Sequence, residues 1–249
     1  MTPRFHRVGR GPHTVIALHG WFGDRLSFSP IEPYLDTDRY SYVFMDYRGY
    51  GDRLNCAGDF TIEETAQDAL TLADALDLPR FSLLGHSMGA MAAERLACVA
   101  PERVRRLVLL APVPACGLLC SEETRALQTQ AATDPAARRA IIDRSTGKRL
   151  PAAWLDWKAQ SSWQRSTPEA FAAYGRAWTE TDFSQDILDR HPALIITGGH
   201  DPVFNRERML RATLQWRPSA KLEILRDAGH YPMNETPLAL ISLLENFLE

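Results

Sequence analysis

The stretch that decides the fold is FSLLGHSMGAMAAERLACVA, residues 81–100. Its apolar beginning, residues 81–84, is typical of a buried strand, and its Ala-rich end, residues 90–100, of an amphipathic helix. Between them lies Gly85-His86-Ser87-Met88-Gly89. A serine at a sharp strand-to-helix turn has a strained backbone, and the positions two before and two after it must carry almost no side chain. Gly85 and Gly89 meet this requirement, so Ser87 is a candidate nucleophile.

Candidates for the partners of this serine occur later in the chain. A serine nucleophile needs a histidine to take its proton, and the histidine needs a carboxylate to hold its tautomer. In sheets with such a turn the chain order is Ser, then Asp or Glu, then His. The strand-like runs at residues 193–197 and 221–225 are followed by Asp201 and by His230. Both candidates therefore lie at the carboxyl edge of the expected sheet, where open parallel sheets build their sites.

Two neighbouring residues offer alternative assignments. His200 adjoins Asp201, but the order of the triad requires the histidine after the last strand, so we interpret His200 as a hydrogen-bonding group of its loop. Asp227 lies three residues before His230. It belongs to the histidine's own loop, whereas a carboxylate from a separate strand approaches the second ring nitrogen more freely. We therefore favour Asp201 over Asp227.

Five segments in this order resemble the α/β-hydrolase superfamily, and together they span nearly the whole chain. They are His19-Gly20, the run Asp46-Tyr47-Arg48-Gly49-Tyr50-Gly51, the turn around Ser87, the loop 198–202 and Gly229-His230. The resemblance implies a mostly parallel, doubly wound sheet with Ser87 as nucleophile, Asp201 as acid and His230 as base. It also implies an oxyanion hole formed by the backbone N–H groups of Trp21 and Met88.

Other polar residues of these segments are expected to have structural roles. A ring N–H of His19 and of His86 can satisfy a backbone carbonyl within its turn. Asp46 and Arg48 are expected to brace their loop electrostatically. We interpret Asp24 as an N-terminal cap for a helix around residues 28–35.

The alternation of strands and helices stops after residue 111. Residues 118–190 read as several helices without a strand, broken at Pro135, Gly147, Pro151 and Pro168. By the resemblance, this stretch is a helical cap over the site, and residues 1–117 and 191–249 form the hydrolase core. We expect some of its aromatic side chains to bind substrate, and our candidates are Trp154, Trp157, Tyr174 and Trp178.

Composition narrows the class of partner. The net charge is -3, and 24% of the residues are charged, without a basic stripe, so we expect neither nucleic acid nor membrane as partner. The N-terminus contains no apolar run of signal-peptide length, which predicts a cytoplasmic protein. The four cysteines show no metal-binding spacing, and we expect no metal and no cofactor. Nothing in the sequence indicates an oligomeric state.

These observations predict a serine hydrolase that cleaves a small carboxylic ester through an acyl-enzyme. Epoxide hydrolases and haloalkane dehalogenases of this fold use an aspartate nucleophile, so Ser87 argues against both. Residues 118–190 contain ten basic and ten acidic residues. This balance favours an uncharged, partly apolar substrate. A lactonase, a thioesterase, and a ligand receptor that keeps the triad with little turnover remain alternatives.

Overall fold

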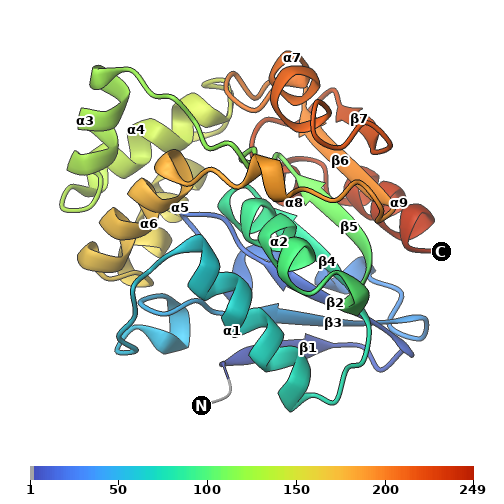
Figure 1. The fold of residues 1–249 in the computed structure, drawn as a ribbon. Helices are drawn as coiled ribbons and strands as arrows, with labels where there is room; N and C mark the ends of the chain where they lie inside the picture. Colours follow the sequence, from blue (N-terminus) through green and yellow to red (C-terminus); the bar gives the residue numbers. More distant parts are fainter. Residues whose placement is uncertain (1–2) are drawn as a thin grey trace.

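The computed structural model describes residues 3–249, and its centre is a seven-stranded sheet in the order β1-β3-β2-β4-β5-β6-β7 (Figure 1). The strands are β1 Phe5–Val8, β2 His13–Leu18, β3 Tyr40–Met45, β4 Phe81–His86, β5 Val104–Leu110, β6 Ala193–Gly198 and β7 Lys221–Leu225. β1 pairs antiparallel with β3, and the other pairs are parallel. The sheet is thus mostly parallel, as the sequence predicts.

Helices flank this sheet. The longer ones outside residues 118–190 are α1 Ile62–Ala75, α2 Met88–Val99 and α9 Pro237–Leu248, and shorter ones are α7 Arg206–Arg208, which runs into a π-helical turn at Met209–Thr213, and α8 Pro232–Glu235. The 3₁₀ turns are η1 Arg25–Phe28, η2 Glu32–Tyr34, η3 Gly51–Arg53, η4 Pro101–Arg103 and η5 Ser184–Asp186. The helix expected around residues 28–35 is absent from the structure, which has η1 and η2 there. Pro30 and Pro33 interrupt the segment, and proline cannot donate a helical hydrogen bond.

The order of the strands determines where the site lies in the sheet. The chain goes from β2 to β3 on one side, then returns to β4 on the other side of β2. Such a reversal leaves a crevice at the carboxyl ends of the two central strands. Leu18 at the end of β2 pairs with Gly85 of β4. The loops that follow β2 and β4 therefore start side by side.

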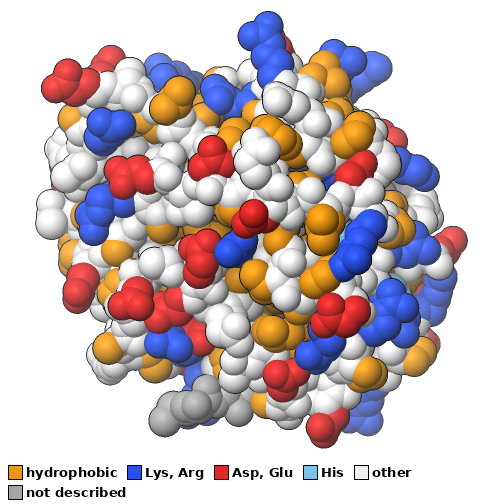
Figure 2. All heavy atoms as spheres, viewed as in Figure 1, with side chains coloured by type: hydrophobic (Ala, Val, Ile, Leu, Met, Phe, Trp, Pro, Cys, Tyr) orange, Lys and Arg blue, Asp and Glu red, His pale blue; other side chains and the backbone are white. Residues whose placement is uncertain are grey.

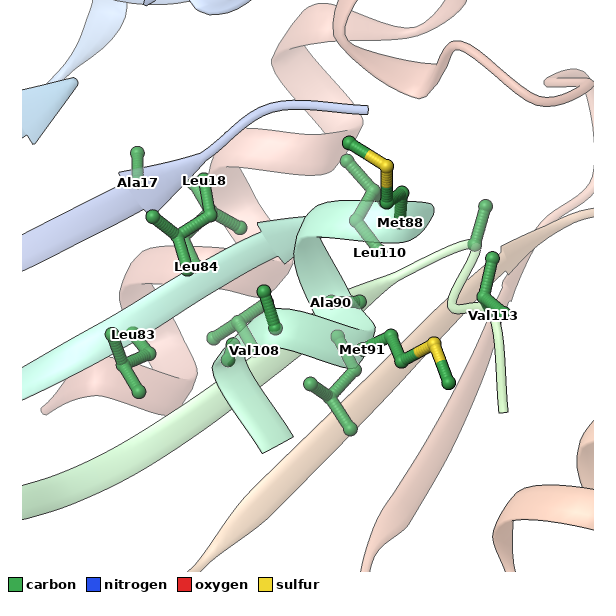
Figure 3. Packing of buried hydrophobic residues seen from close by; sticks show 14 of the residues in the cluster. Ala17, Leu18, Leu83, Leu84, Met88, Ala90, Met91, Val108, Leu110 and Val113 are labelled. Atoms are coloured by element: carbon green, nitrogen blue, oxygen red, sulfur yellow. The ribbon is translucent and has the colours of Figure 1, made fainter. Parts of the chain in front are cut away.

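A buried apolar layer supports the turn at the end of β4. Figure 3 shows Met88, Ala90 and Met91 of α2 together with side chains of β2, β4 and β5. These residues have essentially no exposed surface. The small alanines of α2 let the helix approach the sheet closely, which gives the turn a rigid base.

The chain between β5 and β6 forms four helices, which lie as a group to the left of the sheet in Figure 1. They are α3 Glu122–Gln130, α4 Pro135–Ser145, α5 Ala152–Gln164 and α6 Pro168–Glu180. We call residues 118–190 the helical insertion. The fully buried Arg138 holds its helices together, because its guanidinium donates to the carbonyls of Ala131 and Ser162 and lies 3.7 Å from the ring centre of Phe171.

The surface gives no sign of a strongly charged region on the face shown in Figure 2, where acidic and basic side chains alternate with apolar ones. Within residues 3–249, none of the helices has the length and apolarity needed to cross a bilayer. The described part of the chain also lacks a group of three or more His, Cys, Asp or Glu side chains that could hold a metal ion.

Candidate active site

The turn between β4 and α2 gives Ser87 a strained backbone, with φ 54° and ψ -118°. This is the left-handed region that non-glycine residues rarely adopt. A Cβ atom at Gly85 would lie 2.4 Å from the Ala90 Cα, and one at Gly89 would lie 2.3 Å from the Leu18 carbonyl oxygen. Both neighbours must therefore be glycine for the strand and helix to approach each other at this angle.

Three side chains from separate loops meet at this turn. The Ser87 Oγ lies 3.0 Å from the His230 Nε2, and the His230 Nδ1 lies 2.6 Å from the Asp201 Oδ2. All three residues are at least nine-tenths buried. Histidine in this arrangement can accept the serine proton on one nitrogen while the carboxylate holds the proton on the other.

The carboxylate of Asp201 is itself fixed. Its Oδ1 accepts the backbone N–H groups of Val203 at 2.8 Å and Phe204 at 2.9 Å, which leaves Oδ2 for His230. The two alternative residues lie outside this chain of hydrogen bonds. His200 and Asp227 are both exposed, and the structure brings neither of them to Ser87 or His230.

Two further histidines organise the backbone around the site. The His86 Nε2 donates to the His230 carbonyl oxygen at 2.8 Å, and the His19 Nδ1 donates to the Gly20 carbonyl oxygen at 2.9 Å. Burial lowers the pKa of both imidazoles, and for His86 the nearby His230 lowers it further. Both rings are therefore neutral donors, in the structural role that the sequence predicts.

Two backbone amides are available beside Ser87. A Cβ at Gly20 would lie 3.3 Å from the Ser87 Cβ, so the loop after β2 touches the nucleophile turn. Within residues 3–249, the N–H groups of Trp21 and Met88 have no hydrogen-bond acceptor. Met88 also begins α2, where the helix dipole favours negative charge. Its side chain packs into the core, while Trp21 lines the cavity above Ser87.

Hydrogen bonds from the neighbouring loop hold the peptide groups on either side of the one that carries the Trp21 N–H. The Tyr47 hydroxyl donates to the His19 carbonyl at 2.7 Å, and the Tyr50 hydroxyl donates to the Trp21 carbonyl at 2.9 Å. Burial raises the pKa of both phenols well above the ordinary value, so they remain protonated donors. The sequence placed these tyrosines in a matching segment without revealing that they hold the loop after β2.

The helical insertion also holds this loop. The Trp21 indole N–H donates to the Phe171 carbonyl of α6 at 2.8 Å, and the two rings stack with centres 4.2 Å apart. Gly175, one turn further along α6, allows the close approach, because a Cβ there would lie 2.9 Å from the Trp21 Cζ2. The insertion therefore positions a residue of the candidate oxyanion site.

Charged residues brace the same region. Asp46 accepts the Arg25 backbone N–H at 2.8 Å and pairs with the Arg25 guanidinium, while Arg48 pairs with Asp68 at 2.9 Å. Asp24 caps η1 by accepting the Leu26 N–H. These residues brace loops, as expected, although the element that Asp24 caps is a short 3₁₀ turn.

A cavity of about 290 Å³ opens above Ser87, and both the sheet loops and the helical insertion line it. Its apolar wall includes Trp21, Phe22, Leu118, Leu127, Ile141 and Trp178. A small ester with an apolar part fits a cavity of this size, which is at the lower end of the range for ligand pockets, roughly 300–1,000 Å³.

Of the four aromatic residues expected to bind substrate, Trp178 alone is part of the cavity wall. Trp157 is 54% exposed, and Trp154 packs against Tyr231 with ring centres 5.5 Å apart. Tyr174 is buried against Tyr50, with centres 5.5 Å apart. The structure does not bring these three to the cavity wall, because large aromatics on an inserted helix also serve to pack it against its neighbours.

Lys158 of α5 was missed, although it lines the cavity and is only 5% exposed. The helical spacing contains a signal for it. Leu155, Lys158 and Ser162 follow i, i+3, i+7 spacing, and all three are buried, so the lysine occupies a core-facing position of α5.

Comparison with known proteins agrees with this architecture. The chain is 26% identical over 244 residues to the dihydrolipoyllysine-residue acetyltransferase component of an acetoin cleaving system from Pseudomonas putida. That match covers 91% of this chain and 60% of the relative, so the chain spans less than two thirds of the relative's length.

Solved structures show the same fold. An esterase from Exiguobacterium antarcticum has a TM-score of 0.87 at 21% identity, with 98% of this chain and 95% of that chain covered. An enol-lactonase from Burkholderia xenovorans has a TM-score of 0.83 at 24% identity, with 98% and 95% covered. The expected α/β-hydrolase fold is confirmed. The model of the alpha/beta hydrolase family matches residues 15–243, and this chain therefore belongs to that family.

Proposed function

We propose that this protein is a serine hydrolase that cleaves a small, partly apolar carboxylic ester through an acyl-enzyme. One observation carries the proposal: the hydrogen-bonded series Ser87, His230 and Asp201 opens into a cavity that also receives the loop of Trp21. The esterase with the same fold supports this choice of bond.

The first half of the reaction acylates the serine. His230 takes the Ser87 proton on Nε2 as the Oγ attacks the ester carbonyl, and Asp201 stabilises the imidazolium through Nδ1. The negative charge that develops on the carbonyl oxygen is stabilised by the N–H groups of Trp21 and Met88. His230 then gives its proton to the alkoxide, which leaves as the alcohol.

The second half releases the acid. Water enters after the alcohol leaves, and His230 takes a proton from this water as it attacks the acyl carbon. The tetrahedral intermediate collapses, the Ser87 Oγ leaves, and His230 returns the proton to it. The free acid and the original enzyme result.

The helical insertion acts in this proposal as a cap, with residues 1–117 and 191–249 as the core. Support comes from the cavity, whose wall combines Ser87 and His230 with insertion residues such as Leu127 and Trp178. Contacts made equally in the ground and transition states change binding more than the chemical step. The cap is therefore expected to set the size of substrate that the enzyme prefers.

This role predicts a change of selectivity in Trp178→Ala. We expect the KM for short esters to change little, and the preferred acyl chain to lengthen because the removed indole enlarges the cavity. A series of p-nitrophenyl esters of increasing chain length measures both effects. Trp157→Ala is the matched control, since this tryptophan is exposed and absent from the wall. An identical chain-length profile for the two variants would contradict the assignment of Trp178.

The contact between α6 and the loop after β2 predicts a rate effect in Gly175→Ala. The added Cβ would displace an indole that is held by the Phe171 carbonyl, and with it the Trp21 amide. We expect kcat to fall about tenfold, since displacing an oxyanion donor weakens transition-state stabilisation. Arg176→Ala, an exposed change on the same helix, is the control. Unchanged kcat in Gly175→Ala would show that the insertion does not position this amide.

The proposed function itself is tested by assaying esters, lactones and thioesters of equal acyl length with the same enzyme preparation. We expect saturable turnover above about 1 per second for the preferred ester, a rate within the ordinary range for enzymes. Preference for a lactone or thioester would change the leaving group assigned here. Binding of all three classes without turnover would favour a receptor.

A further inference from the structure

Lys158 places a cation inside the cavity above Ser87. The chain has three lysines. Lys148 and Lys221 are exposed, whereas Lys158 is only 5% exposed. Its Nζ lies 5.3 Å from the ring centre of Tyr231, the residue after His230. Its charge also lowers the pKa of His86, the residue before Ser87. The ammonium group is therefore close to the proposed reacting atoms.

Within residues 3–249, this ammonium group has no hydrogen-bond or ion-pair partner and is near only the face of the Tyr231 ring. Asp24 provides the one carboxylate that favours its charge, but it makes no hydrogen bond to Lys158. The Asp24 carboxylate instead pairs with Arg165 and accepts the Leu26 N–H. A buried ammonium without a counter-ion costs free energy, so its retention in the cavity wall calls for an explanation.

The charges around the cavity leave an excess of positive charge. Arg144 and Arg208 also belong to its wall. Among the described lining residues the one carboxylate is Asp201, whose oxygens are occupied by His230 and two backbone N–H groups. The cavity thus lacks an internal anion for Lys158 and can receive one from a ligand.

We infer that Lys158 binds a carboxylate group carried by the substrate, so that the preferred ester is the monoester of a small dicarboxylic acid. This inference rests on the proposed ester hydrolysis and adds a substrate class to it. The volume of about 290 Å³ favours a compact anion over a nucleotide-sized one. A charge-assisted hydrogen bond to Lys158 would fix the free end of the acyl chain.

This substrate class differs from the uncharged ester expected from the sequence. That expectation used the equal numbers of acidic and basic residues in the helical insertion. Most of those residues are exposed or paired, as in the ion pair of Arg139 with Asp156, and they do not face the cavity. Of the three cations in the cavity wall, Lys158 alone is buried, so it contributes most to the charge that a ligand meets there.

The test compares two p-nitrophenyl esters of equal chain length, the monoester of adipic acid and the ester of hexanoic acid. We expect the wild type to prefer the adipate ester in kcat/KM by roughly 10- to 100-fold, as one charge-assisted hydrogen bond would give. Lys158→Met should reduce this preference to about one, mainly through KM. Lys221→Met removes the same charge at an exposed position on β7 and should keep the preference.

The preference should also depend on pH. Burial lowers the pKa of Lys158 from 10.5 to about 8, partly offset by Asp24. The ammonium is charged below this pH and neutral above it, so the adipate preference should fall as pH rises through about 8 and stay flat in Lys158→Met. Taking the ratio of the two esters removes the shared effect of His230. The other titratable or charged groups that face Lys158 or line its cavity are His19, Asp24, His86, Cys120, Arg144, Asp201, Arg208 and Tyr231.

Stability separates ligand binding from a structural role. If Lys158 serves only to pack on Tyr231, Lys158→Met should lower the Tm. The inference predicts a higher Tm for this variant, because methionine removes a buried charge that lacks a partner. The difference in Tm should shrink as the pH rises from about 7 to about 9.5, since the lysine loses its charge in the folded state first.

Direct binding keeps the inference separate from the proposed function. Calorimetry with Ser87→Ala should show that monoethyl adipate binds at least about tenfold more tightly than ethyl hexanoate, and that adding Lys158→Met removes the difference. If this holds but no ester is hydrolysed by the wild type, the proposed function fails and the carboxylate site stands. If Ser87-dependent hydrolysis occurs without any adipate preference in binding or turnover, the inference is overturned and the proposed function stands.

Discussion

Ser87→Ala is expected to lower kcat for p-nitrophenyl esters by about 10⁴- to 10⁶-fold. The variant removes the hydroxyl that lies 3.0 Å from the His230 Nε2 and leaves the apolar layer beneath the turn unchanged. We therefore expect a normal circular dichroism spectrum and normal ligand binding. Turnover comparable to that of the wild type would exclude Ser87 as the nucleophile.

Ser87→Gly is the informative companion to this variant. It also lacks the hydroxyl, so its turnover should be equally low. Glycine tolerates the φ of 54° that strains Ser87, and we expect about 1 kcal/mol of added stability, measured as a higher Tm. Alanine keeps most of the strain. A gain in Tm in the glycine variant alone would show that the protein accepts backbone strain at this turn in order to position the nucleophile.

Asp201→Asn is expected to lower kcat by about 10⁴-fold. The amide oxygen of asparagine can keep the bonds from Val203 and Phe204 that Asp201 Oδ1 accepts. Its NH₂ group then faces the His230 Nδ1, so this nitrogen must become the acceptor, and the proton moves to Nε2. The histidine would be held in the tautomer that cannot take the serine proton.

Asp227→Asn provides the control for this prediction. Asp227 is exposed and lies three residues before His230 in the same loop, which made it the alternative candidate for the acid. We expect less than about a threefold change in kcat, because a surface substitution away from the site rarely has a large effect. Equal losses in the two variants, or a larger loss in Asp227→Asn, would show that Asp201 is not the acid of the triad.

The main features of the site were predictable because each lies next to a strand end that the sequence marks clearly. Close backbone contacts require glycine at positions 85 and 89. Such a requirement is visible in the sequence, because glycine is the one residue that meets it. Asp201 and His230 follow β6 and β7, and parallel pairing of these strands brings their carboxyl ends to one edge. β1 escaped prediction because its short sequence, FHRV, carries no continuous apolar run at the edge of the sheet.

The cavity wall was harder to predict because it depends on how the helical insertion packs. Aromatic residues such as Tyr174 and Trp178 share one face of α6, yet the first lies against Tyr50 and the second reaches the cavity. The spacing of residues along a helix shows which side chains share a face. It does not show which neighbouring element covers each part of that face. Lys158 illustrates the same limit, since its importance comes from lacking a partner, which only the folded arrangement reveals.

The acyl-enzyme is the most direct test of the central claim that Ser87 is an esterase nucleophile. Wild-type protein would be mixed with excess p-nitrophenyl ester, quenched in acid within milliseconds and analysed by mass spectrometry of the intact chain and its peptides. The account predicts one added acyl group, located on Ser87, formed together with a burst of nitrophenol and absent from Ser87→Ala. Steady turnover without any acyl group on Ser87, or an acyl group on another residue that turns over at the steady-state rate, would contradict it.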